Sequence, residues 1–104
     1  TMNDKAIYQF LGLAQKAGFL LSGSEQLMDG LKHKKGTLLL ITEDASERTA
    51  GEYRAIAERN RIPWRTFGEK EKLGQALGKG VRTAVLITDS GFGQAVCRKL
   101  DAGR

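Results

Sequence analysis

The sequence predicts an α/β fold in which helices cover both faces of a single sheet. Two runs of apolar residues, 37–42 (TLLLIT) and 83–88 (TAVLIT), have turn signals on both sides and the composition of strands buried on both faces. Segments whose apolar residues recur at three- and four-residue spacing precede and follow these runs. Strands and helices therefore alternate along the chain, which is typical of layered α/β proteins.

The first helix is expected to begin at Asn3 or Asp4, either of which can cap it, and to end at Gly18. Its apolar positions have the spacing of one helix face: Ile7, Phe10, Leu11, Ala14 and Ala17. This pattern indicates a helix that packs on the sheet through one side.

The second helix is predicted from the stretch SGSEQLMDG, residues 22–30. Ser22 and Glu25 have the spacing of a capping box, in which each side chain bonds to the backbone N–H of the other residue. The apolar face consists of Leu27, Met28 and Leu31, and Gly36 is expected to close the helix. The stretch is richer in polar residues than a cap requires, which raises the question of a binding site.

The third helix follows the first apolar strand and runs to about Asn60. Asp44 and Glu47 have the spacing of a second capping box. The apolar positions expected to face inward are Ala50, Tyr53, Ile56 and Ala57. Residues 62–67 then alternate as in a strand, and Pro63 suits the first residue of a strand or a strand at the edge of a sheet.

Two further helices complete the chain. One carries Leu73, Ala76 and Leu77 and ends at Gly78, and the other carries Phe92, Val96 and Leu100. Phe92 and Cys97 are assigned to the core. Trp64 is expected to be buried or half-buried on the same side of its strand as Ile62, because alternate strand residues share a face.

The chain is short and basic. Its 104 residues suit one domain, 1–104, that buries roughly 60–68% of its unfolded surface. Seventeen Lys and Arg residues against twelve Asp and Glu residues give a net charge of +5, which favours a polyanionic partner such as nucleic acid. A modest basic surplus also keeps a small protein soluble, so charge alone leaves both interpretations open.

Cysteine content and hydropathy favour a cytoplasmic protein. The single Cys97 has no partner for an internal disulfide, and no cluster of Cys and His suggests a zinc site. No apolar run approaches the roughly 18 residues that cross a membrane, and the N-terminus lacks the pattern of a signal peptide. Thr1 stands before Met2, where translation begins, and is expected to be a remnant of expression.

The sequence lacks the motifs of common cofactor sites. Residues 74–80 have three residues instead of four between the first two glycines of a phosphate-binding loop, and no Ser or Thr follows the lysine. Residues 91–93 match only the first three positions of a dinucleotide-binding fingerprint. We therefore expect no cofactor and no small-molecule substrate.

Candidate catalytic residues are few. His33 lies among lysines and is expected to be a solvated residue at a helix end, since no carboxylate lies nearby in sequence to orient it. Glu43 and Asp44 follow a buried strand, where they can hold Mg²⁺ or act as an acid–base pair, although capping of a helix explains Asp44 more simply. A binding module is therefore favoured over an enzyme.

Residues 22–46 (SGSEQLMDGLKHKKGTLLLITEDAS) and 61–88 (RIPWRTFGEKEKLGQALGKGVRTAVLIT) resemble the kink-turn RNA-binding ribosomal protein family of the L7Ae/L30e type, and within it the small bacterial YlxQ-like proteins. The likeness extends from Leu11 to about Leu100, and its specificity comes from the order and spacing of several short motifs. It implies a three-layer α-β-α sandwich around a mixed four-stranded sheet. It also implies binding to a sharply bent RNA built on tandem sheared G·A pairs.

The family's RNA contacts follow a glycine in the pattern Gly-x-Asn-Glu-x-x-Lys at the start of the second helix. Gly23 matches the glycine, Ser24 follows it, and Glu25, Gln26 and Asp29 stand at the Asn, Glu and Lys positions. Gln26 can donate and accept on a base edge, and Glu25 can accept from the N–H groups of guanine. Asp29 places a negative charge where the family brings a positive one to the RNA backbone, so affinity is expected to suffer.

Other cations are candidates for phosphate contacts. Lys32 lies three residues after Asp29, so it either reaches the same phosphates or pairs with Asp29 in solvent, and we favour the pairing. The family's second contact region is the loop before the last strand. There Lys79 and Arg82 are expected to meet phosphates, while Val81 packs on an unstacked base.

The resemblance thus implies a cytoplasmic, monomeric, non-enzymatic RNA-binding protein whose partner is structured, kink-turn-like RNA, ribosomal RNA included, without membrane attachment. The three departures from the motif support a rival hypothesis, a ribosome-associated or protein-interaction module whose kink-turn binding is weakened or lost. A metal-dependent enzyme built on Glu43 and Asp44 is the third and least favoured hypothesis.

Overall fold

A computed structural model describes residues 4–102 of the chain. Its helices and strands follow in the order α1 (Asp4–Lys16), β1 (Leu20–Leu21), α2 (Ser24–Lys32), β2 (Leu38–Ile41), α3 (Glu47–Arg59), β3 (Trp64–Thr66), α4 (Lys70–Ala76), β4 (Ala84–Ile87) and α5 (Ser90–Ala102). The predicted alternation of helices and strands is confirmed. Thr1 and the proposed cap Asn3 lie outside the described residues, and α1 begins at Asp4.

The four strands form one mixed sheet in the order β1-β4-β2-β3. The central strand β2 runs antiparallel to β4 and parallel to β3, with Leu39 opposite both Leu86 and Trp64. Because β3 lies at the edge, the expectation from Pro63 is confirmed. The other edge strand, β1, pairs with β4 through only two residues, and the resemblance alone implied a fourth strand.

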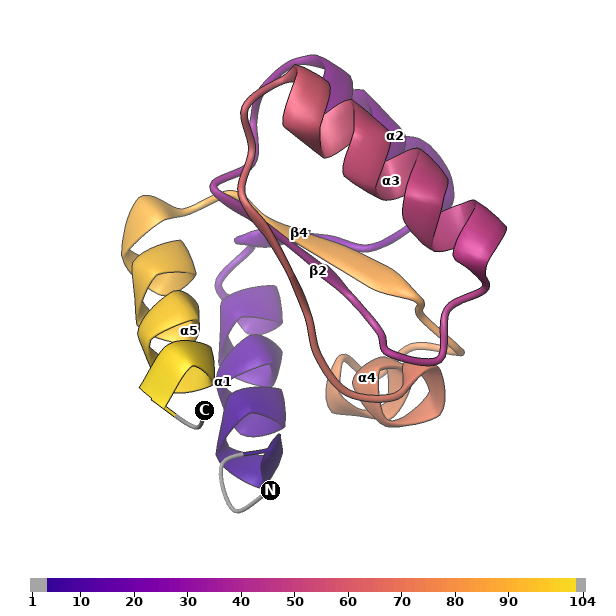
Figure 1. Cartoon of the computed structure of the whole chain (residues 1–104). Helices are drawn as coiled ribbons and strands as arrows, with labels where there is room; N and C mark the ends of the chain where they lie inside the picture. Colours follow the sequence, from indigo (N-terminus) through magenta and orange to yellow (C-terminus); the bar gives the residue numbers. More distant parts are fainter. Residues whose placement is uncertain (1–3, 103–104) are drawn as a thin grey trace.

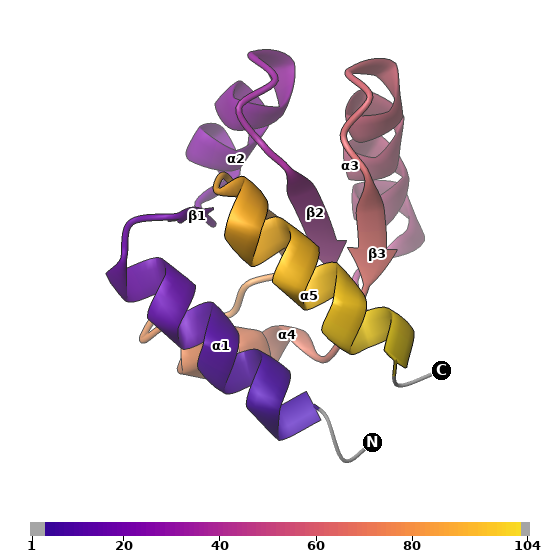
Figure 2. The same ribbon diagram turned by 90° about the vertical axis from the view of Figure 1, so that its left-hand side faces the viewer.

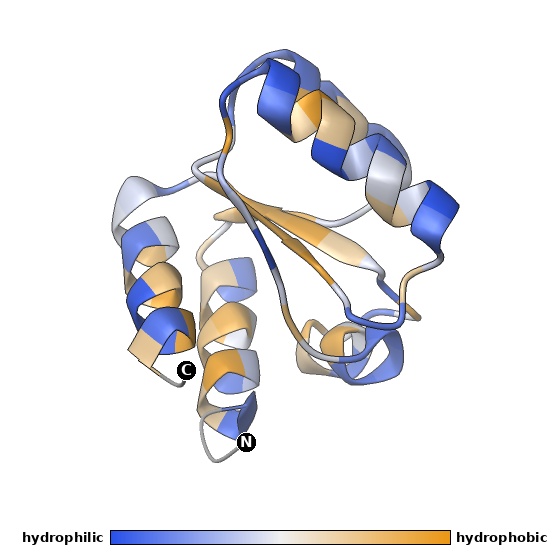
Figure 3. Cartoon of the chain, in the orientation of Figure 1, coloured by the Kyte–Doolittle hydropathy of each residue, from blue (hydrophilic) through white to orange (hydrophobic). Residues whose placement is uncertain are grey.

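Helices α1, α4 and α5 cover one face of the sheet, and α2 and α3 cover the other (Figures 1 and 2). Alternate residues of β2 serve the two layers: Leu38 and Leu40 join the core under α1, α4 and α5, while Leu39 and Ile41 join the core under α2 and α3. Figure 3 shows the central strands as hydrophobic and the outward sides of the helices as largely hydrophilic. The three-layer sandwich is confirmed.

Some residues assigned to the core lie at its margin. Phe92 and Cys97 are half-buried and pack against the cluster under α1 and α5. Ala17, counted on the apolar face of the first helix, is exposed just beyond the end of α1. Trp64 is half-buried beside Ile62, as predicted. Within residues 4–102, no helix is long and apolar enough to cross a lipid bilayer.

The ends of the helices follow the predictions only in part. Gly18 and Gly78 end α1 and α4 in the left-handed region, with φ of 82° and 68°, which confirms their assignment. Gly36 does not end α2, because Lys34 already has a left-handed backbone, with φ of 56°. The absent side chain of Gly36 instead makes room for Leu86, with which an added Cβ would clash.

The capping box predicted for the third helix is wrong. Ser46 is the N-cap of α3, and its hydroxyl accepts a hydrogen bond from the Thr49 N–H at 3.2 Å. Asp44 and Glu47 therefore do not cap this helix together. The Asp44 carboxylate turns to another helix and accepts from the Lys70 N–H at the start of α4, at 3.0 Å.

Candidate nucleic-acid interface

The start of α2 has no side-chain cap. Its N-cap is Gly23, whose backbone is extended (φ −73°, ψ 143°) and whose carbonyl accepts from the Leu27 N–H at 2.8 Å. The capping box predicted from Ser22 and Glu25 is therefore wrong. Within residues 4–102 the N–H groups of residues 24–26 have no acceptor, and all three residues are exposed. This helix start thus presents free donors and the positive end of the helix dipole.

A hollow of about 470 Å³ lies between the start of α2 and the α4–β4 loop, residues 77–83. The α2 side contributes residues 22–26, and the loop contributes Lys79 and Arg82. Gln15 of α1 also lines the hollow, and its Oε1 is buried without a hydrogen-bond partner in the described part of the chain. Sequence reasoning missed Gln15, because a polar residue at this position of an amphipathic helix carries no distinguishing signal.

The α4–β4 loop is held tightly against α4. The Lys79 N–H donates to the Gly74 carbonyl at 2.8 Å. A Cβ added to Gly74 would clash with the backbone of Gly80, so only glycine permits this close approach. Lys79 is exposed at the tip of the loop, and so is Val81, at 54%. The loop therefore presents a cation and an apolar side chain on a fixed backbone.

Arg82 lies between the loop and the start of α2. Its Nε donates to the Ser22 hydroxyl at 3.2 Å across 60 residues of sequence. Its Nη1 donates to the carbonyls of Val81 at 3.0 Å and Gly80 at 3.4 Å. The Ser22 hydroxyl thus accepts a hydrogen bond from Arg82 and does not cap α2 as predicted.

Asp29 is exposed on α2 and pairs within its own helix end. Its Oδ1 is 3.1 Å from Nδ1 of His33, and its Oδ2 is 3.9 Å from Nζ of Lys35. The predicted pair of Asp29 with Lys32 is therefore wrong, and Lys32 is exposed without an ion pair among residues 4–102. The statement that no nearby carboxylate orients His33 is also wrong, although His33 is exposed at the helix end as expected.

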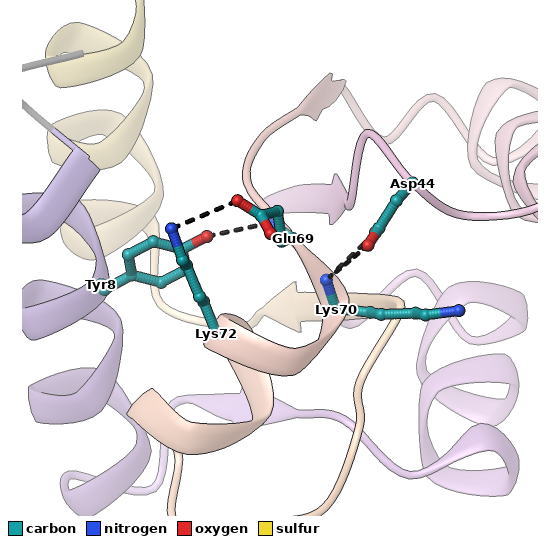
Figure 4. A network of polar contacts seen from close by, with 5 residues as sticks. All are labelled: Tyr8, Asp44, Glu69, Lys70 and Lys72. Carbon is teal, nitrogen blue, oxygen red and sulfur yellow. Dashed lines mark hydrogen bonds and ion pairs between the residues drawn. The ribbon is translucent and has the colours of Figure 1, made fainter.

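The start of α4 differs from that of α2, because side chains from distant elements take its N–H groups (Figure 4). The Tyr8 hydroxyl of α1 accepts from the Glu69 N–H at 2.9 Å, and the Asp44 carboxylate accepts from the Lys70 N–H. Lys72 Nζ lies 3.2 Å from the Glu69 carboxylate, which raises the pKa of Lys72. Side chains from outside α4 therefore occupy the first two donors of this helix start, those of Glu69 and Lys70.

The hypothesis of a metal site at Glu43 and Asp44 gains no support from their surroundings. Among residues 4–102, no group of three or more His, Cys, Asp and Glu side chains is placed to hold a metal ion. Partial desolvation raises the pKa of Asp44, but the Thr42 hydroxyl and the Lys70 N–H facing the carboxylate lower it, and the net shift is downward. Asp44 is thus a charged cap for α4.

Comparison with known proteins places these features in a family. Residues 5–97 match the model of the ribosomal protein L7Ae/L30e/S12e/Gadd45 family. The chain is 31% identical over 100 residues to the RNA-binding protein YlxQ of Bacillus subtilis (strain 168), covering 96% of this chain and 100% of that protein. It is 27% identical over 90 residues to the RNA-binding protein YlxQ of Enterococcus faecium, covering 86% of each.

Solved structures share the fold. A protein with unknown function from Bacillus halodurans C superimposes with a TM-score of 0.85 at 29% identity, over 91% of this chain and 96% of that chain. The Giardia lamblia 15.5kD RNA binding protein gives a TM-score of 0.79 at 15% identity, over 98% of this chain and 88% of that chain. At that identity the second likeness concerns the fold alone.

Proposed function

Because the chain belongs to the ribosomal protein L7Ae/L30e/S12e/Gadd45 family, we propose that it binds RNA and recognises bent, kink-turn-like RNA, ribosomal RNA included, through the start of α2 and the α4–β4 loop. It acts without catalysis, as a cytoplasmic monomer. The observation that carries the proposal is the uncapped start of α2, which faces a hollow shared with a cationic loop.

The start of α2 supplies donors for acceptor groups of the RNA. Free N–H groups at the positive end of a helix dipole favour phosphate oxygens and base acceptors. An added Cβ on Gly23 would meet nothing nearer than 3.9 Å, so the space in front of this backbone is open. In this proposal Ser24 borders the RNA, Gln26 reads a base edge, and Glu25 accepts from guanine N–H groups.

The α4–β4 loop supplies the second contact. Lys79 meets phosphate, and the exposed Val81 packs on a base that the bend has unstacked. The tight packing of Gly74 against Gly80 holds the backbone that carries these two side chains against α4. A rigid pair of contacts suits an RNA that is recognised by its shape.

Asp29 weakens this interface without excluding it. Its charge faces phosphate, but Lys35 lies 3.9 Å from its carboxylate and offsets part of the repulsion. Lys32 is exposed on the same helix and is available to a phosphate. Asp29 nevertheless favours a second candidate function, a ribosome-associated or protein-interaction module with weakened or lost kink-turn binding.

A gel-shift titration separates the two candidates. Protein is titrated against a kink-turn RNA and against the same RNA with its G·A pairs replaced, at several salt concentrations. The proposal expects at least about tenfold preference for the kink-turn RNA, and a fall of log affinity with log salt of about 0.7–0.9 per phosphate neutralised. Equal affinity for both RNAs favours the second candidate, and a salt slope near zero contradicts a phosphate-based interface.

A further inference from the structure

Arg82 forms hydrogen bonds to both segments of the candidate interface, the start of α2 and the α4–β4 loop. Its guanidinium donates to Ser22, which precedes the cap of α2, and to two carbonyls of the α4–β4 loop. We propose that Arg82 is a positioning residue, which fixes the start of α2 against the loop, and that its main role is not to neutralise a phosphate. This inference rests on the proposed function, because it concerns how the same RNA site keeps its shape.

The backbone alone does not fix the two segments to each other. Strand β1 pairs with β4 only through Leu20 and Leu21, so the ladder of hydrogen bonds ends before the chain reaches α2. Among residues 4–102, the bond from Arg82 to Ser22 is the one hydrogen bond beyond Leu21 that joins the segment before α2 to the segment before β4. The Arg82 side chain therefore continues, by one hydrogen bond, the connection between the two chain segments that the short β1–β4 pairing begins.

The geometry of arginine suits this role. Nε points to Ser22, while Nη1 points back to the loop carbonyls, so one planar group engages two segments in fixed directions. The Arg82 backbone is anchored as well, because its N–H donates to the Lys70 carbonyl at 3.1 Å. Lysine carries the same charge but has no such planar fork, so it cannot reproduce the bridge.

The bridge and a phosphate contact predict different effects of substitution. Ser22 carries no charge, so loss of its hydroxyl leaves the salt dependence of RNA affinity unchanged, and if it acts through the bridge its effect is not additive with that of an Arg82 substitution. A phosphate contact at Arg82 contributes to the dependence of affinity on salt, whereas a bridge within the protein does not. Lys79, exposed in the same loop, provides the matched case of a phosphate contact.

The test measures kink-turn affinity across a salt series for S22A, R82K, R82Q, K79Q and the double variant S22A/R82K. We expect S22A and R82K each to weaken binding about three- to tenfold at an unchanged salt slope, and the double variant to be no weaker than either alone. R82Q keeps the wild-type slope, while K79Q lowers it by about 0.7–0.9. Circular dichroism and thermal melts check that every variant is folded.

The outcomes separate this inference from the function on which it rests. If the wild type binds the kink-turn RNA but S22A binds equally well, or R82Q loses as much slope as K79Q, the bridge is refuted and the RNA-binding proposal stands. If the wild type shows no preference for the kink-turn RNA, both proposals fail. Unchanged affinity of R82K together with a lower slope for R82Q would identify Arg82 as a phosphate contact.

Discussion

The starts of α2 and α4 lie on opposite faces of the sheet and differ in whether side chains from elsewhere in the fold accept from their first N–H groups. At α4, the Tyr8 hydroxyl and the Asp44 carboxylate accept from the first N–H groups (Figure 4). At α2, Gly23 provides no side chain, and the free donors face a hollow. The difference teaches that the chain can satisfy a helix start through distant side chains, and that it leaves one start available to an external acceptor.

The first prediction concerns Gly74, which lies within α4 and packs against the backbone of the α4–β4 loop. In Gly74→Ala, the new Cβ clashes with the backbone of Gly80, so the α4–β4 loop must move. We expect a loss of about 1–3 kcal/mol in the free energy of unfolding, together with weaker binding of kink-turn RNA. Urea denaturation and the gel shift measure the two effects.

Gly51→Ala is the matched control for this substitution. Gly51 lies within α3, and an added Cβ would meet only the end of the Arg54 side chain, at 3.9 Å. Alanine there should stabilise the protein by about 0.5–1 kcal/mol and leave RNA affinity unchanged. The same sign for both alanine variants would contradict the role assigned to the contact between Gly74 and Gly80.

The second prediction converts the start of α2 into one like that of α4. In Gly23→Asp, the extended backbone and the open space accept a side chain whose carboxylate can bond to the free N–H groups. We expect stability to rise by roughly a few tenths of a kcal/mol and RNA affinity to fall at least about tenfold, because the donors are occupied and a negative charge faces phosphate.

Gly23→Asn separates capping from charge in that experiment. Asparagine caps a helix about as well as aspartate but is neutral. It should therefore retain the gain in stability and lose less affinity than Gly23→Asp, with the difference between the two variants shrinking at high salt. Wild-type RNA affinity in both variants would show that the start of α2 is not an RNA contact.

The contrast between the two helix starts also marks what could be predicted from the sequence. The apolar runs of β2 and β4 identified both strands, because burial on both faces leaves a local signal. The two capping boxes were mispredicted, since the partner of Ser22 lies 60 residues away and that of Asp44 lies 26 residues away. The spacing of residues within a short motif does not show that a partner far away in the sequence will bind the same side chain.

The candidate site shows the same limit. The resemblance supplied Gly23 and its neighbours, and the structure places them beside Lys79 and Arg82 across one hollow. No sequence pattern distinguished Gln15 or indicated that Ser22 faces Arg82. The two-residue strand β1 was likewise missed from the residues, because two positions are too few to show any periodicity.

The third prediction sharpens the role of the exposed face of α2. Asp29→Lys restores a cation at the position where the family pattern has lysine, and it removes the negative partner of His33 and Lys35. We expect kink-turn affinity to rise about three- to tenfold and the salt slope to steepen by about 0.7–0.9. Asp29→Ala should give a smaller gain without the added slope, and unchanged affinity in Asp29→Lys would refute the mapping of the motif.

The last prediction, with the smallest expected effect, uses the pH dependence of stability to test the contact between the Asp44 carboxylate and the start of α4. The folded pKa of Asp44 lies below its ordinary value of 3.8, so the charged carboxylate stabilises the fold fully above that value and less as pH falls from 3.8 towards the folded pKa. In urea denaturation from pH 3 to 7, the advantage of the wild type over Asp44→Asn should therefore be constant near neutral pH and shrink in acid. Tyr8→Phe removes the other acceptor, a hydroxyl that stays neutral over this range, so its cost should not follow pH in the same way. A wild-type advantage over Asp44→Asn that is independent of pH would mean that the carboxylate caps α4 only as a neutral hydrogen-bond acceptor.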